Sequence, residues 1–138
     1  MEVDEPDWYC THVLPGHVAV DVVRETPEVL AFRPPVPGFG TEHIIVVPRL
    51  HVRSLLELGP STGAALLQVL KETSAEVVHR YGGCQAITSM GDEQHNRHLH
   101  IHLAVGDGIA RFIRHVQPPD GIRDYTEGPA GRKSLPGT

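Results

Sequence analysis

His98-Leu99-His100-Ile101-His102-Leu103 is a run of six residues in which imidazole and aliphatic side chains alternate without a break. Successive side chains of an extended strand point to opposite faces, so the three imidazoles share one face and the three aliphatic side chains share the other. We expect the aliphatic face to pack on the core. Buried imidazoles need partners for their ring nitrogens, and leaving three without partners costs stability. The alternation therefore predicts a functional site on the histidine face.

The clearest helix is expected upstream of this strand. It begins near Ser61, a good N-cap residue that follows Gly59-Pro60, and runs to about Tyr81, where Gly82-Gly83 ends it. The side chains that recur at three- and four-residue spacing predict one apolar face for packing on a sheet. They are Leu66, Leu70, Thr73, Val77 and Tyr81, with Leu67, Ser74 and Val78 beside them.

Short β-branched and apolar segments predict the rest of the sheet. They cover residues 17–23, 29–32, 43–47 and 84–89, and the histidine strand extends over 98–105. The three prolines of residues 34–40 predict an irregular loop, and a short helix is expected over 54–58. The fold class is α+β, with about five antiparallel strands packed against one long helix plus a short one.

The length and charge of the chain limit the classes of function. A chain of 138 residues with 40% hydrophobic residues predicts one domain, over residues 1–117, and the Pro/Gly-rich residues 118–138 are read as a tail. The net charge of −5 without a basic cluster argues against a nucleic-acid partner. The two cysteines form no CxxC pair and no apolar run reaches the ~18 residues that span a bilayer, so a cytoplasmic protein with no membrane partner is expected.

Three interpretations of the histidine strand are open at this point. The histidines can be exposed residues of an amphipathic strand, ligands of a metal ion, or catalytic groups. The sequence shows no obvious carboxylate or thiolate near the strand to complete a metal site. We therefore favour nucleophilic catalysis, in which a neutral imidazole attacks phosphorus and forms a phosphoramidate-type intermediate.

The residues also carry a family resemblance. The run HLHIHLA, the upstream segment His43-IIVVP-Arg49-Leu-His51 and the loop Gly91-Asp-Glu-Gln94 together resemble the histidine triad (HIT) superfamily over residues 8–105. The resemblance implies a HIT-like fold and a hydrolase or nucleotidyl transferase acting at an α-phosphorus. It implies as substrate a nucleoside phosphoramidate, a dinucleoside polyphosphate or a nucleotidylated small molecule, with release of a nucleoside monophosphate. It implies no cofactor and a homodimer.

The resemblance also implies roles for individual residues. His100 is the nucleophile, His98 holds the ring and tautomer of its neighbour, and His102 donates to the phosphate or to the leaving-group oxygen. His43 falls where the family places a fourth active-site histidine. Contacts to substrate fall on Gln94, Ser89, His95 and Phe32.

The sequence departs from the family pattern at several positions. Pro34 stands where an acidic residue binds the ribose, and Ser89 and His95 replace the usual residues near the leaving group. Some members bind structural zinc through an N-terminal CxxC and two histidines, and here Val13 stands at the partner position of Cys10. A set of Cys10, His12 and His51 is an alternative. A nucleotide-binding module without hydrolysis, and a metalloprotein that uses the triad as ligands, remain open as functions.

Overall fold

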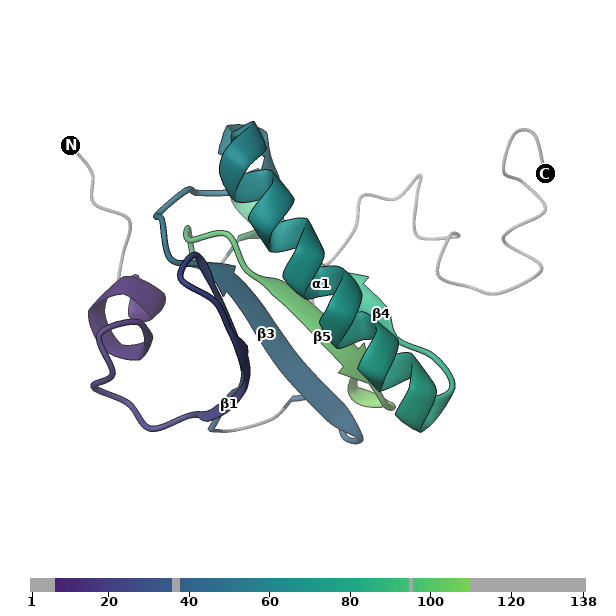
Figure 1. Ribbon diagram of the computed structural model, residues 1–138. Helices are drawn as coiled ribbons and strands as arrows, with labels where there is room; N and C mark the ends of the chain where they lie inside the picture. The colour runs from purple at the N-terminus through teal and green to yellow at the C-terminus, as the bar shows by residue number, and fades with distance from the viewer. Residues whose placement is uncertain (1–6, 36–37, 95, 110–138) are drawn as a thin grey trace.

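The structure is a computed structural model that describes residues 7–35, 38–94 and 96–109. The described residues form one antiparallel five-stranded sheet with the strand order β1-β2-β3-β5-β4, and one long helix crosses it (Figure 1). The expected α+β class is therefore confirmed. The proposed boundary at residue 117 and the tail over 118–138 lie outside the described residues. The strands are β1 (Asp21–Glu25), β2 (Val29–Arg33), β3 (Glu42–Pro48), β4 (Gln85–Ile87) and β5 (Ile101–Val105).

The two faces of the sheet bury different sets of side chains. All seven residues of β3 are buried, and their alternation divides them between the faces. Ile44 and Val46 belong to a core that includes side chains of the long helix α1 (Pro60–Tyr81). Ile45 and Val47 belong to a second core on the opposite face, which we call the N-terminal core because Tyr9 and Val13 contribute to it.

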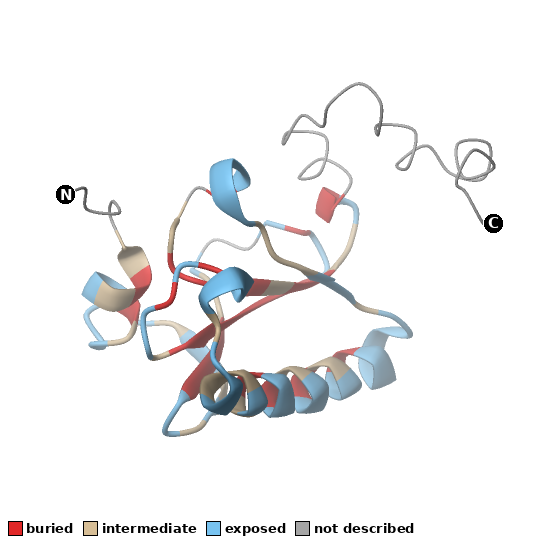
Figure 2. Ribbon diagram, turned by 90° about the horizontal axis from the view of Figure 1, so that it is seen from above, coloured by how far each residue is buried: buried red, intermediate tan, exposed pale blue. Residues whose placement is uncertain are grey.

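The long helix forms where the Gly and Pro residues at its two ends predict it, with two differences. Its N-cap is Gly59 and Pro60 occupies the first turn, so Ser61 is not the cap as expected. Proline favours this position because its missing N–H has no partner in the first turn of any helix. Gly82 ends the helix with a φ of 86°, which glycine adopts without strain. The inward residues are Leu66, Val69, Thr73 and Val77, whereas the expected inward residues Leu67, Val78 and Tyr81 are exposed. Buried and exposed residues alternate along the length of this helix (Figure 2).

A short π-helix, η1 (Tyr9–Val13), packs on the face opposite α1, and the sequence analysis did not predict it. Its Tyr9 and Val13 cover Phe32, Ile45 and Val47. The segment after it joins the sheet only from Asp21, so the first strand begins later than the expected residues 17–23 and extends past them to Glu25. Two single-turn helices, η2 (Leu55–Glu57) and η3 (Gly91–Glu93), lie within the expected short helix and within the loop before the triad. Within the ranges described, no helix has the length and apolarity needed to cross a membrane.

The histidine strand keeps its alternation but is shorter than expected. The ladder of β5 begins at Ile101, because the preceding backbone bonds elsewhere: the amide of His98 donates to Oδ1 of Asn96 (2.9 Å), and the amide of Leu99 donates to the carbonyl of Val52 (2.8 Å). Leu99, Ile101 and Leu103 still lie in the core beneath α1. The histidines therefore occupy the opposite face, on the side of η1.

Candidate active site and an adjoining metal site

Two histidines from neighbouring strands form a hydrogen-bonded pair at the centre of the site. His102 on β5 is in register with Ile45 on β3, which brings it beside His43 two residues earlier on the same face. Nε2 of His43 lies 2.8 Å from Nδ1 of His102. The backbone amide of Gly38 donates to Nδ1 of His43 at 3.0 Å.

These contacts fix where the protons of the pair lie. A backbone amide can only donate, so Nδ1 of His43 accepts and its hydrogen is on Nε2. That hydrogen is donated to Nδ1 of His102, and the neutral ring of His102 consequently carries its own hydrogen on Nε2. Gly38, His43 and His102 thus form a chain of hydrogen bonds in which each group donates to the next.

His100 is held in the complementary tautomer. Its Nδ1 lies 2.7 Å from the backbone carbonyl of His98, and a carbonyl can only accept, so Nδ1 carries the hydrogen. The lone pair of the neutral ring is then on Nε2, which is the form a nucleophile requires. Thr88 donates its hydroxyl to the carbonyl of His100 (2.8 Å), which fixes the backbone at this residue. The expected influence of His98 on its neighbour is thus exerted by its main chain.

Aromatic rings enclose the row of histidines at both ends. The ring of Tyr9 lies 5.2 Å from that of His100, and the ring of Phe39 lies 4.4 Å from that of His43, edge to face. The rings of His100 and His102 are 5.1 Å apart and nearly perpendicular. Packing on both sides limits rotation of the imidazoles and removes water from around them.

The surroundings of His43 and His102 keep both rings neutral. Burial lowers the pKa of His43 to about 4. Burial, together with the neighbouring His100 and His43, lowers the pKa of His102 to about 3. At neutral pH, His102 is therefore a neutral hydrogen-bond donor through Nε2–H.

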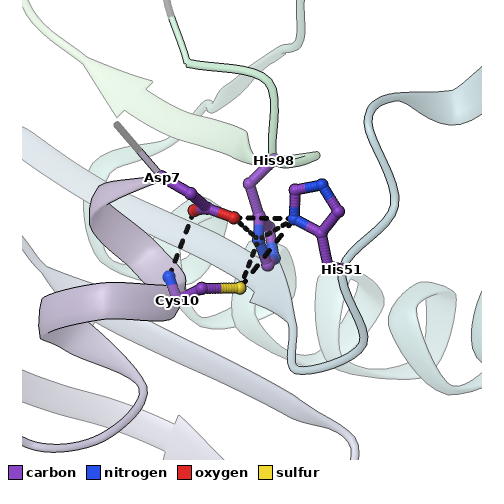
Figure 3. A group of neighbouring side chains, drawn as sticks. All are labelled: Asp7, Cys10, His51 and His98. Carbon is purple, nitrogen blue, oxygen red and sulfur yellow. Dashed lines mark hydrogen bonds and ion pairs between the residues drawn. The ribbon is translucent and has the colours of Figure 1, made fainter. Parts of the chain in front are cut away.

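The side chain of His98 points away from the other two triad rings into a separate cluster. His98 is fully buried, and its Nδ1 faces Asp7, Cys10 and His51 (Figure 3). Nδ1 of His98 lies 3.4 Å from Sγ of Cys10, 3.3 Å from Nδ1 of His51 and 3.1 Å from Oδ2 of Asp7. Its Nε2 lies 2.8 Å from the carbonyl of Pro48. Because His98 is buried, the expected catalytic role of its imidazole would have to be exerted without contact to substrate.

The cluster fits a divalent metal ion. One ligand atom from each of Asp7, Cys10, His51 and His98 lies within 4.8 Å of the others. The outer separations are 3.8 Å between Sγ of Cys10 and Nδ1 of His51, and 2.6 Å between that Nδ1 and Oδ2 of Asp7. Tetrahedral zinc with bonds of about 2.0–2.3 Å separates its ligands by roughly 3.3–3.7 Å, so small shifts of these side chains would admit the ion. The donor set of one thiolate, one carboxylate and two imidazoles suits zinc.

The electrostatics of the cluster favour an added cation. Burial, followed by the Asp7 carboxylate, raises the pKa of the Cys10 thiol to about 11. Burial acts to raise the pKa of Asp7, but hydrogen bonds from Cys10 and His98 outweigh it and lower the pKa. A bound metal ion would deprotonate the thiol and take the place of these hydrogen bonds.

The expected metal ligands are therefore corrected. Val13 lies in the N-terminal core, and the ring of His12 is exposed beside the hydroxyl of Thr11 (2.7 Å). Of the alternative set, Cys10 and His51 belong to the cluster and His12 does not, and Asp7 and His98 complete it. The interpretation in which all three triad rings bind one metal is also corrected, because only His98 joins the cluster.

The expected substrate contacts lie in different surroundings. Gln94 is buried and donates its amide to the carbonyls of Arg53 (2.6 Å) and Asn96 (3.0 Å), so its two hydrogens are bound by backbone. Phe32 is fully buried beneath Tyr9 and Trp8, and direct contact with a ligand would require η1 to move. Ser89 is half-buried between β4 and η3, and His95 lies outside the described residues. These four remain predictions.

Three groups of the site were missed. Asp7, Tyr9 and the amide of Gly38 reach the histidines from segments far from the triad in sequence. The spacing Asp7-x-x-Cys10 was the available signal for the metal site, since Asp replaces Cys as a zinc ligand. No sequence signal identifies a backbone amide as a partner of His43.

No protein-family model matches the chain, and no curated protein sequence matches it. Several solved structures match the chain. A histidine triad protein from Clostridium difficile is 27% identical with a TM-score of 0.62, over 78% of this chain and 95% of that one. A HIT family hydrolase from Clostridium thermocellum is 23% identical with a TM-score of 0.61, over 76% and 94%. A hypothetical histidine triad nucleotide-binding protein from Sulfolobus tokodaii is 24% identical with a TM-score of 0.64, over 71% and 67%. The resemblance noted in the sequence is confirmed, and the fold is that of these structures.

Proposed function

We propose that this chain, which has the histidine triad fold, is a nucleotide hydrolase or nucleotidyl transferase that acts at an α-phosphorus through a covalent nucleotidyl-histidine. The observation that carries the proposal is the contact of 2.7 Å between Nδ1 of His100 and the carbonyl of His98. It holds the hydrogen on Nδ1 and the lone pair on Nε2, as attack on phosphorus requires. The substrate is a nucleoside phosphoramidate, a dinucleoside polyphosphate or a nucleotidylated small molecule.

In the first step, Nε2 of His100 donates its lone pair to the α-phosphorus as the bond between phosphorus and the leaving group breaks. The leaving group departs with that electron pair and takes a proton from water. The ring of the nucleotidyl-histidine is then positively charged, and its Nδ1–H points at the carbonyl of His98, which stabilises the charge.

In the second step, water or another acceptor attacks the same phosphorus. The bond between phosphorus and Nε2 breaks, its electron pair returns to the ring, and the acceptor loses a proton to solvent. With water the product is a nucleoside monophosphate. The Nε2–H of His102 donates a hydrogen bond to a phosphate oxygen in both steps. The lowered pKa of His102 keeps the ring neutral. The ring does not transfer this proton, because the loss of it would leave an imidazolate.

Asp7, Cys10, His51 and His98 would hold a divalent ion whose contribution is structural. Their side chains fix η1 against the end of β3, and the main chain of His98 orients His100. No step of the reaction involves them directly.

The names of similar structures support this class of activity. One is a HIT family hydrolase and another a histidine triad nucleotide-binding protein. We further propose that the protein is cytoplasmic, has no nucleic-acid or membrane partner, and is a homodimer. The exposed Leu67 and Val78 on α1 and the edge position of β4 support the homodimer. Light scattering of the purified protein would measure its mass.

Mass spectrometry of the protein quenched during turnover tests the reaction. Incubated with adenosine phosphoramidate, the unsubstituted protein should carry a nucleotidyl adduct on His100. His100→Asn should abolish both adduct and release of adenosine monophosphate, whereas His79→Asn on the exposed side of α1 should leave both unchanged. Full turnover by a folded His100→Asn protein would overturn the proposal.

A binding module without hydrolysis is the second candidate. Pro34 supports it, because proline offers no carboxylate for the ribose hydroxyls at the position where the resemblance expects an acidic residue. Calorimetry distinguishes the two. Tight nucleotide binding without any adduct or product across a panel of nucleotide conjugates would favour the module.

A further inference from the structure

The turn over residues 38–41 packs on the backbone that follows β5, and two glycines make this approach possible. A Cβ atom at Gly106 would lie 1.9 Å from the carbonyl oxygen of Phe39 and 2.7 Å from the amide nitrogen of Thr41. A Cβ at Gly108 would lie 2.4 Å from the carbonyl oxygen of Gly38. No side chain fits at such distances unless the turn moves away. The turn and the glycines therefore form one backbone contact, which we call the glycine clasp.

The glycine clasp is stabilised by a backbone hydrogen bond and by the buried ring of Phe39. The amide of Thr41 donates to the carbonyl of Val105 at 3.0 Å. Phe39 is buried with Ala104 and Ile109, and its ring also lies edge to face on His43. The clasp thus fixes the turn in front of the imidazole of His43.

The clasp matters because of what the turn presents to the site. The amide of Gly38 is the donor that holds Nδ1 of His43 as an acceptor. If this amide moved away, the hydrogen of His43 could sit on either ring nitrogen. If the hydrogen of His43 were on Nδ1, its Nε2 would present a lone pair to Nδ1 of His102. The hydrogen of the neutral His102 ring would then be on Nδ1, where it can be donated to that lone pair. Nε2 of His102 would then turn a lone pair toward phosphate oxygens, where the reaction needs a donor.

We propose that Gly106 and Gly108 are positioning residues that hold the amide of Gly38 on His43 and thereby fix the tautomers of His43 and His102. The proposal rests on the proposed function only for its effect on turnover. The tautomers themselves are a property of the free protein and are measured without substrate.

Long-range ¹H–¹⁵N spectra of protein labelled with ¹⁵N-histidine report the tautomer of each ring. In the unsubstituted protein at neutral pH, His43 and His102 should both carry the hydrogen on Nε2. Gly108→Ala should shift these two rings to a mixture of tautomers and leave the exposed rings of His12 and His17 unchanged. Gly83→Ala is the matched control, because Gly83 has open space around the position of its Cβ and no positive φ.

Turnover gives the second readout. Gly108→Ala should lower kcat about 10- to 100-fold with less than a threefold change in KM, since one oriented donor to the phosphate typically contributes a factor of about 10² to 10³. Gly83→Ala should leave kcat unchanged. If the tautomers shift in Gly108→Ala but the unsubstituted protein turns over no nucleotide conjugate, the proposed function fails and the positioning role stands.

A further pair of variants serves where Gly108→Ala does not fold. Gly38→Ala keeps the amide and brings its Cβ only to ordinary contact, 3.8 Å from Nδ1 of His43, so the Nε2–H tautomer of His43 should persist. Gly38→Pro removes the amide hydrogen and should lose it. Unchanged tautomers in folded Gly108→Ala or in folded Gly38→Pro would overturn the proposal.

Discussion

Nε2 of His98 lies 2.8 Å from the backbone carbonyl of Pro48, so this nitrogen carries a hydrogen, and Nδ1 is the nitrogen that faces Asp7 and Cys10. A metal ion bound between these residues would take the lone pair of Nδ1 in the neutral ring. A metal-binding imidazole is commonly oriented in this way through its second nitrogen. We expect the purified protein to hold about one zinc ion per chain, measured by elemental analysis. Asp7→Asn should weaken zinc affinity by a factor of about 10 to 100, and chelation should lower Tm.

Cys84→Ser is the control for the metal prediction, because Cys84 is the second half-buried cysteine and lies outside the cluster. Asp7→Cys should raise the affinity for zinc, since thiolate is the softer ligand. The metal site would be refuted by absence of bound zinc in both the unsubstituted and the Asp7→Cys proteins after reconstitution.

The stability of the protein should fall with acid because His43 and His102 have lowered pKa values. His43 stays neutral in the native state down to about pH 4 and His102 down to about pH 3, whereas in the unfolded chain both rings take up protons near the ordinary histidine pKa of 6.5. The stabilisation is therefore complete above pH 6.5 and is lost as the pH falls, down to about 4 for His43 and about 3 for His102. At pH 5 the loss should be roughly 2 kcal/mol for each ring, or about 4 kcal/mol for the two together, measured by urea unfolding.

The His43→Gln, His102→Gln double variant should flatten this dependence between pH 6.5 and 5. His12→Gln should retain it, because His12 is exposed. An identical slope in the double variant would assign the acid sensitivity to other groups.

Arg33 and Glu42 form a two-pronged ion pair beside His43. Nε of Arg33 lies 2.9 Å from Oε1 of Glu42, and Nη2 lies 3.1 Å from Oε2. The hydrogen bond from Arg33 lowers the pKa of Glu42, whose side chain is 5% exposed. Arg33→Met would leave this carboxylate buried without its cation and should cost about 3 kcal/mol of unfolding free energy.

Arg49→Met is the matched control for that measurement. Arg49 pairs with Glu25, whose side chain is 57% exposed, so its loss should cost less than about 1 kcal/mol. Equal losses in the two variants would show that burial of Glu42 does not decide the cost.

Thr73 on α1 offers a stabilising substitution. It is fully buried, and within the described part of the chain its hydroxyl has no hydrogen-bond partner. Thr73→Val keeps the shape and removes the unpaired hydroxyl, so Tm should rise by an amount equivalent to about 1 kcal/mol. Thr62→Val in the half-buried first turn of α1 controls for helix propensity and should change Tm little. A lower Tm for Thr73→Val would show that the hydroxyl is paired.

The features that the sequence predicted depend on local patterns. The alternation from His98 to Leu103 sorted the side chains between two faces because the period of an extended chain is two, even where no ladder forms. Gly59-Pro60 and Gly82-Gly83 located the long helix because they restrict the backbone directly. Its inward face was less well predicted, since Val69 and the exposed Leu67 are equally apolar and only packing distinguishes them.

The features that were missed depend on contacts between distant segments. Asp7 reaches His98 across 91 residues, and no pattern near either residue records that contact. The amide of Gly38 has no side chain to signal its role. The π-helix η1 is five residues long, too short to show periodicity, and it forms because Tyr9 and Val13 bury against Phe32.

The docking of η1 has a practical consequence for experiments. Trp8 is the only tryptophan of the chain, and its ring lies 5.3 Å from that of Tyr9 and 6.3 Å from that of Phe32. It is next in sequence to Asp7, one of the four residues of the candidate metal site. Its emission should shift to longer wavelength if η1 leaves the sheet and water reaches the indole. The chain therefore contains its own fluorescent reporter, with which the predicted binding and release of a metal ion can be tested in real time without any label.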